Sequence, residues 1–192
     1  SMADHTRVLI VDDEPDLADL YASWLPEAYA VDTAYDGTDA IEMLDGSVDA
    51  VLLDRRMSGT SGDTVLEWIR DHGLGCGVAM ITAVDPDFDI LELGFDAYLT
   101  KPVSAPELTG VTDRLLRRME YTDTLQELFA KLSTRDALAV EKPKVELEAD
   151  EQYQRLEAEV EALREESEAH LSELDGEDFE ALFYRLDEPD QV

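Results

Sequence analysis

The chain has 192 residues, 44% of them hydrophobic, which is enough for one globular domain and an appendage. It carries 15 basic and 47 acidic residues, and the net charge of −32 disfavours binding to nucleic-acid phosphates or anionic membranes. Its single cysteine, Cys76, excludes an internal disulfide and a cysteine-based zinc site. Because the sequence has no long apolar run and no signal-peptide pattern, we expect a cytoplasmic protein.

Five short apolar runs alternate with amphipathic segments through the first 120 residues. The strands are predicted at 7–11, 29–34, 51–53, 78–82 and 97–100. Apolar residues at helical spacing predict helices over 17–25, 40–44, 65–69 and 90–93, and a further helix that begins at Ser104. This alternation predicts an α/β fold, a doubly wound five-stranded parallel sheet with the flavodoxin-like strand order 2-1-3-4-5.

Several polar residues follow these strands directly. Asp54 ends the third strand, where it could be a strand-end or helix-capping residue, and Asp12 and Asp13 end the first. In the predicted order these strands are neighbours at the point where ligands bind. Three carboxylates at this distance repel one another, which raises the free energy of the folded chain unless some are protonated or a hard cation lies among them. Mg²⁺ favours such oxygen ligands. Thr82 and Lys101 would add a hydroxyl and a cation, which gives the outline of a phosphoryl-transfer site.

With Met57, Gly62, Ala83 and the run 96–102, these residues make positions 5–121 resemble a response-regulator receiver domain. The resemblance implies that Asp54 is the phosphoacceptor for a sensor histidine kinase. It also implies an Mg²⁺ site, formed by the side chains of Asp12, Asp13 and Asp54 and the backbone carbonyl of Arg56.

The same resemblance implies a conformational switch. Lys101 would pair with the phosphoryl oxygens, Thr82 would move to hydrogen-bond them, and Tyr98 would turn inward. A phosphoryl group adds about −1.5 to −2 charges. Differential contacts of about 1–3 kcal/mol are enough to bias the surface formed by the fourth helix, fifth strand and fifth helix.

Two positions depart from the family pattern. Ser58 replaces a common proline, which predicts a more mobile loop. Arg56 could shield the acyl phosphate, contact the phosphoryl group or face solvent.

The C-terminal third predicts a helical hairpin. The helix from Ser104 shows no stop before about Ala139, and Pro143 breaks the pattern. A second helix then has a polar-interrupted seam with three- and four-residue spacing at Tyr153, Leu156, Val160, Leu163, Ser167, His170 and Leu174. Residues 179–186 predict a short amphipathic helix that folds back. The chain thus divides into residues 5–121 and an acidic helical module, 122–192.

The acidic charge is spread along the whole chain, with a net −17 in residues 1–121 and −15 in residues 122–192. With only four lysines, this composition is similar to that of haloarchaeal cytoplasmic proteins, and it predicts a requirement for salt. The acidic helical module resembles that of HalX-type response regulators. We expect an output or dimerisation role, with a downstream protein or a homodimer as partner. A phosphorylation-controlled, DNA-binding transcriptional regulator is the alternative. No enzymatic constellation is evident in the module.

Overall fold

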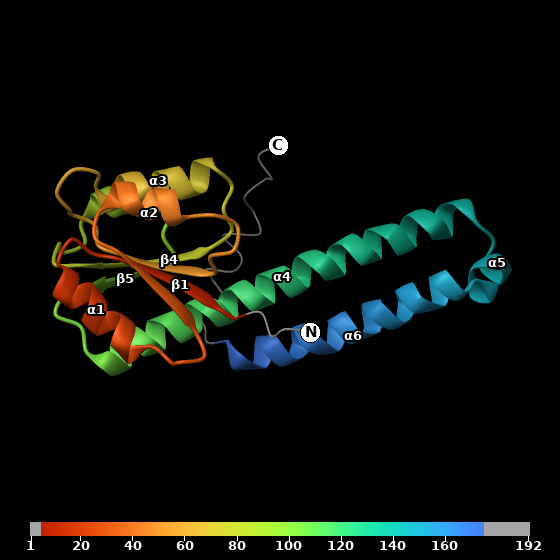
Figure 1. The fold of residues 1–192 in the computed structure, drawn as a ribbon. Helices are drawn as coiled ribbons and strands as arrows, with labels where there is room; N and C mark the ends of the chain where they lie inside the picture. The colour runs from red at the N-terminus through yellow and green to blue at the C-terminus, as the bar shows by residue number, and fades with distance from the viewer. Residues whose placement is uncertain (1–4, 175–192) are drawn as a thin grey trace. The chain divides into compact units, whose positions relative to one another are not determined.

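A computed structural model describes residues 5–174, which separate into two compact units between Leu116 and Arg117. The first unit contains a five-stranded, wholly parallel sheet with the order β2-β1-β3-β4-β5 (Figure 1). The strands are β1 (Arg7–Val11), β2 (Ala30–Ala34), β3 (Ala50–Leu53), β4 (Gly77–Thr82) and β5 (Ala97–Thr100). The predicted fold class and strand order are confirmed.

Helices cover both faces of this sheet. They are α1 (Pro15–Trp24), α2 (Gly37–Met43), α3 (Gly62–Asp71), the 3₁₀ helix η1 (Phe88–Glu92) and the first turns of α4 (Ala105–Glu141). Helices α2 and α3 lie on one face, and α1 with the start of α4 on the other (Figure 1). Leu9 and Leu53 therefore pack in one core cluster while Ile10 and Leu52 pack in the other. Because both faces are covered, β3 and β4 are buried along their whole length.

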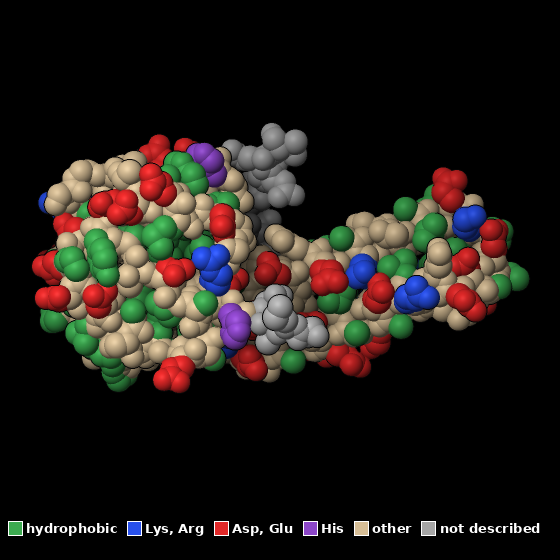
Figure 2. Space-filling model, in the orientation of Figure 1, with side chains coloured by type: hydrophobic (Ala, Val, Ile, Leu, Met, Phe, Trp, Pro, Cys, Tyr) green, Lys and Arg blue, Asp and Glu red, His purple; other side chains and the backbone are tan. Residues whose placement is uncertain are grey.

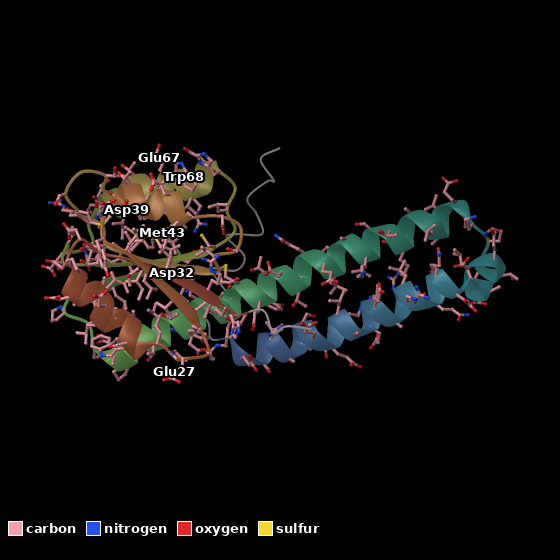
Figure 3. All side chains as sticks on the ribbon, viewed as in Figure 1. Glu27, Asp32, Asp39, Met43, Glu67 and Trp68 are labelled. Carbon is pink, nitrogen blue, oxygen red and sulfur yellow. The ribbon has the colours of Figure 1, made fainter. Side chains whose placement is uncertain are left out.

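Local signals explain where the helices begin. Pro15 occupies the first turn of α1. At the start of α4, the Glu107 amide donates to the Ser104 hydroxyl and the Ser104 amide donates to the Glu107 carboxylate, a reciprocal capping box. On α3, Trp68 packs against the core while Glu67 is exposed (Figure 3). The amphipathic pattern read from the sequence therefore fixes which side of α3 faces the sheet.

The second unit is an antiparallel helical hairpin made of the rest of α4, α5 (Lys144–Ala149) and α6 (Glu151–Glu173). Its apolar seam is formed by Leu128, Leu132, Leu156, Val160 and Leu163. The rings of Tyr121 and His170 have centroids 6.4 Å apart, and Lys131 Nζ donates to Glu159 Oε2 at 2.7 Å. Since positions later in α4 meet positions earlier in α6, the two helices run antiparallel, as the hairpin prediction requires. Acidic side chains are scattered over the viewed surface of this unit (Figure 2).

Two segments differ from the sequence predictions, and a third lies outside the residues that the structure describes. The helix expected over 90–93 is only the five-residue η1, which Asp87 caps and on which Phe88 and Leu91 are largely exposed. Helix α5, which follows Pro143, was not predicted. The helix predicted at 179–186 lies outside the described residues. Among the helices of residues 5–174, none combines the length and the apolar character that a membrane crossing requires.

Candidate functional site

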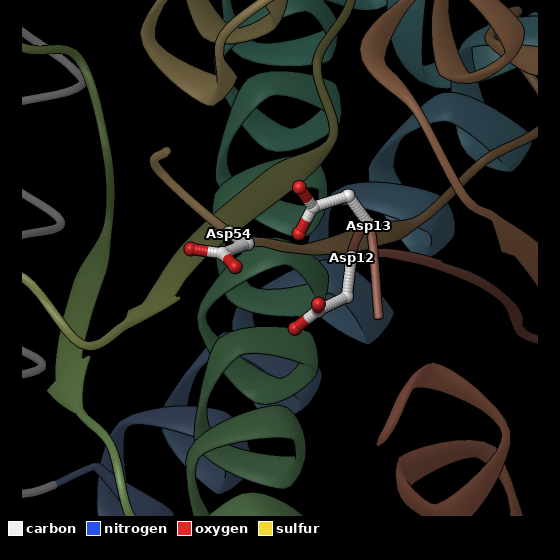
Figure 4. A group of neighbouring side chains, drawn as sticks. All are labelled: Asp12, Asp13 and Asp54. Carbon is white, nitrogen blue, oxygen red and sulfur yellow. The ribbon is translucent and has the colours of Figure 1, made fainter. Parts of the chain in front are cut away.

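Three carboxylates meet at the C-terminal edge of the sheet. Asp12 and Asp13 follow β1 and Asp54 follows β3, and one oxygen of each lies within 4.8 Å of the others (Figure 4). The register explains this arrangement, because Val11 pairs with Leu53 in the last rung before the aspartates. Asp12 and Asp54 are buried, and Asp13 is partly exposed.

Lys101 lies between two of these carboxylates. Its Nζ donates to Asp12 Oδ2 at 2.7 Å and to Asp54 Oδ2 at 3.0 Å. Burial opposes the charged form of Lys101, but the hydrogen bonds to both carboxylates outweigh it and raise the pKa of the ammonium. Burial also raises the pKa of Asp12, although Lys101 and the Glu14 amide act in the opposite direction. The Lys101–Pro102 peptide bond is cis.

Ser58 contacts the third carboxylate. Its amide and its hydroxyl both donate to Asp13 Oδ2, at 3.2 and 3.4 Å. A proline at this position would have neither donor. The sequence predicted only a more mobile loop at Ser58, and spacing did not indicate this contact. The serine in place of the family's proline was the available signal.

The two predicted switch side chains both contact Val84. Thr82 is buried, and its Oγ1 accepts a hydrogen bond from the Val84 amide at 3.3 Å. The Tyr98 hydroxyl donates to the Val84 carbonyl at 2.6 Å, and its ring is half-buried beside Phe95. In this arrangement both side chains are held by the backbone of the loop that follows β4.

A cavity of about 490 Å³ opens over the carboxylates, lined by Asp13, Glu14, Asp54, Arg56, Thr82, Ala83, Val84 and Lys101. The side chain of Arg56 is exposed at its rim. The structure thus brings Asp12, Asp13, Asp54, Thr82 and Lys101 together, while Tyr98 is connected to this region by its hydrogen bond to Val84.

The donor set suits a hard divalent cation. Three carboxylates face a single ammonium, so the cluster keeps an excess of negative charge beside an open cavity. Oxygen ligands of this kind, with room for water, are what Mg²⁺ requires. The residues present therefore fit Mg²⁺, the ion predicted from the sequence.

Comparisons with known proteins match the two units separately. Residues 8–113 match the response regulator receiver domain family, and residues 117–183 match the HalX domain family. A Haloferax volcanii protein described as a candidate transcriptional regulator is 49% identical over 165 residues, which cover 85% of this chain and 28% of that protein. The response regulator SaeR of Staphylococcus epidermidis is 36% identical over 122 residues, 62% of this chain and 53% of SaeR. This chain therefore spans about half or less of both relatives.

The fold is also similar to solved receiver structures. The crystal structure of a CheY-like response regulator receiver domain protein from Methanospirillum hungatei has a TM-score of 0.54 and 27% identity. The similarity covers 60% of this chain and 96% of that one.

Proposed function

The chain belongs to the response regulator receiver family, and from this membership we propose that it works as a two-component response regulator whose phosphoacceptor is Asp54. The donor would be a phosphohistidine of a sensor histidine kinase. The observation that carries the proposal is the position of Asp54, which lies at the floor of an open cavity among two further carboxylates and Lys101.

In the proposed reaction an Asp54 carboxylate oxygen forms a bond to phosphorus while the bond from phosphorus to the donor imidazole nitrogen breaks. Mg²⁺, held by Asp12, Asp13, Asp54 and the backbone carbonyl of Arg56, would neutralise negative charge on the transferring group. Lys101 would release a carboxylate contact and pair with a phosphoryl oxygen. Such transfers depend mainly on positioning and electrostatic stabilisation, which these residues supply without any change of fold.

The proposed switch starts at Thr82. Its hydroxyl, which accepts from the Val84 amide, would move toward a phosphoryl oxygen and donate to it, and this movement would draw Oγ1 away from the Val84 amide. The loop at Val84 would then shift, and the hydrogen bond from the Tyr98 hydroxyl to the Val84 carbonyl would break. A change at Asp54 would thereby reach β5 and the surface around η1.

The first test uses phosphoryl transfer from a small-molecule donor, acetyl phosphate, with Mg²⁺. Intact-mass measurement should show one added phosphoryl group on the wild-type protein and none on Asp54→Asn. The matched control is Asp71→Asn, an exposed carboxylate on α3 that should leave phosphorylation unchanged. Phosphorylation that persists in Asp54→Asn would exclude Asp54 as the acceptor.

For residues 122–192 we propose a protein-interaction output, acting through a downstream protein or through a homodimer, with residues 5–121 as the receiver. Helix α6 favours this reading because it carries eight glutamates against Arg155 and Arg164. Beryllofluoride with Mg²⁺ mimics phosphorylation, so light scattering of the full chain with and without it should reveal any change in mass. A response that survives in Asp54→Asn would separate the effect from the receiver site.

The second candidate function is a phosphorylation-controlled transcriptional regulator that binds DNA. It is favoured by the description of the Haloferax volcanii relative. Binding of genomic DNA fragments at about 1 M salt, where non-specific phosphate contacts are screened, would support it. Binding that disappears with rising salt and shows no sequence preference would argue against it.

A further inference from the structure

Arg55, the residue directly after Asp54, has a buried guanidinium. Its side chain is 6% exposed, in contrast to the exposed side chain of Arg56. Its Nε donates to Asp63 Oδ1 at 3.0 Å, and its Nη2 donates to Asp63 Oδ2 at 3.2 Å. Nη2 also donates to Asp89 Oδ2. A single cation therefore joins the β3–α3 loop to the first turn of α3 and to η1.

The two carboxylates that contact Arg55 differ in their distance from it along the chain. Asp63 lies on α3, one residue after Gly62. The Gly62 amide donates to the Arg55 carbonyl at 2.8 Å, so the start of α3 is held against the backbone of Arg55. Asp63 thus belongs to the same local structure as Arg55. Asp89 lies 34 residues further along the chain than Arg55, on η1, and is 57% exposed. The Arg55–Asp89 contact is therefore the one that spans from the phosphoacceptor loop to the switch surface.

This contact holds the segment that has to move in the proposed switch. Val84, which contacts both Thr82 and Tyr98, lies five residues before Asp89 in the same connection between β4 and β5. The Tyr98 hydroxyl is also among the groups that stabilise the charged guanidinium of Arg55. Arg55 thus contacts the segment at η1, and it also interacts with the switch tyrosine on the neighbouring strand β5.

We propose that Arg55 is a positioning residue of the receiver: its ion pair with Asp89 holds η1 and the Val84 loop in the arrangement where Thr82 is turned to Val84. This inference rests on the proposed function of Asp54. An ion pair that stabilises one arrangement reduces the population of the other, and a ligand that needs the other then binds with lower apparent affinity. Breaking the pair should therefore favour the arrangement in which Thr82 reaches the phosphoryl group.

The sign of this effect is opposite to that of ordinary damage. Loss of a contact that merely supports the fold would weaken ligand binding or leave it unchanged. Loss of the Arg55–Asp89 pair should strengthen it, by about three- to fivefold for a partly exposed charged contact.

The experiment titrates the full chain with beryllofluoride at saturating Mg²⁺ and measures the dissociation constant by calorimetry. Asp89→Asn should lower the constant by about three- to fivefold. Asp85→Asn is the matched control, because it removes an exposed negative charge in the same segment, next in sequence to Val84 of the cavity lining. It should leave the constant within about twofold, so general electrostatics cannot imitate the result.

A double-mutant cycle assigns the effect to the pair. Arg55→Gln and the double variant Arg55→Gln/Asp89→Asn should bind beryllofluoride alike, since the Arg55–Asp89 pair is already broken in both, whereas Asp89→Asn alone differs from wild type. Asp63→Asn, which keeps the contact to η1, should bind like wild type. If Arg55→Gln fails to fold, the comparison of Asp89→Asn with Asp85→Asn still decides the proposal.

The possible outcomes separate the two hypotheses. An unchanged or raised dissociation constant in Asp89→Asn, with normal binding by wild type, would overturn the role of Arg55 alone. Failure of wild type to bind beryllofluoride, or equal binding by Asp54→Asn, would overturn the proposed function and this inference with it.

Discussion

Lys101 offsets the charge of two carboxylates at the sheet edge. Its removal should therefore lower the free energy of unfolding most when Mg²⁺ is absent. In Lys101→Met, Asp12 and Asp54 keep their positions but lose their shared donor. Removing one partner of a buried ion pair costs about 3–5 kcal/mol, and the open cavity beside this one should reduce the cost to about 1–3 kcal/mol. We expect the free energy of unfolding in urea to fall by that amount without Mg²⁺ and to recover in part when Mg²⁺ is added. Lys144→Met, at an 88% exposed side chain, should change neither value.

The same residue predicts a dependence on pH. The pKa of Lys101 is raised above its usual 10.5 in the folded chain. Its contribution to stability is therefore complete below that usual value and is lost as the pH rises through the folded-state pKa. Wild type should lose stability above about pH 10.5, and Lys101→Met should show a shallower loss. Equal slopes in the two proteins, measured by urea unfolding at several alkaline pH values, would contradict this role for Lys101.

Residue types at strand ends were enough to predict which side chains meet, because a parallel sheet brings those ends to one edge. Asp12, Asp13, Asp54, Thr82 and Lys101 all follow from that rule. Ser58 and Arg55 do not, since their contacts depend on the path of the loop after β3. The donation of two hydrogen bonds by Ser58 to Asp13 requires a backbone geometry that spacing does not encode.

Among the elements, the start of α3 has the tightest steric requirement. A Cβ added at Gly62 would lie 1.9 Å from the Asp54 carbonyl oxygen, closer than any packing allows. Gly62→Ala should therefore push α3 away from the phosphoacceptor loop and lower stability by about 2–4 kcal/mol. Gly75→Ala, which meets nothing within 4 Å, is the control and should stay within about 0.5 kcal/mol of wild type in urea unfolding. Comparable stability of the two variants would mean that the start of α3 can move away from the Asp54 backbone without a loss of stability.

Element type was predictable where the apolar pattern was long and failed where it was short. Helices α1, α3 and α4 each bury a stripe that only a helical period can produce. Residues 90–93 offered too few positions to separate an α-helix from a 3₁₀ turn. The Asp87 cap and the contact of Asp89 with Arg55 hold the short η1 in place, and the second of these is tertiary. Helix α5 fills a turn whose only sequence signal was Pro143.

At the scale of the whole molecule, charge should control stability. A net charge of −32 on 192 residues makes the compact state repel itself, and the range of that repulsion depends on salt. The Debye length is about 10 Å at 0.1 M and roughly 3 Å at 1 M, so concentrated salt should remove most of the repulsion between surface carboxylates. We therefore expect the thermal midpoint to rise steeply between 0.1 and about 2 M KCl.

The salt experiment needs a control for effects unrelated to screening. Sucrose at the same osmolality strengthens burial without screening charge, so it should raise the midpoint much less than KCl does. Neutralising α6 with several Glu→Gln substitutions on its exposed face, at Glu157, Glu161 and Glu165, should raise the midpoint at 0.1 M more than at 2 M. A midpoint that is the same at 0.1 and 2 M KCl would mean that screening of the surface carboxylates does not stabilise the folded chain. Some other property of the chain would then offset its charge.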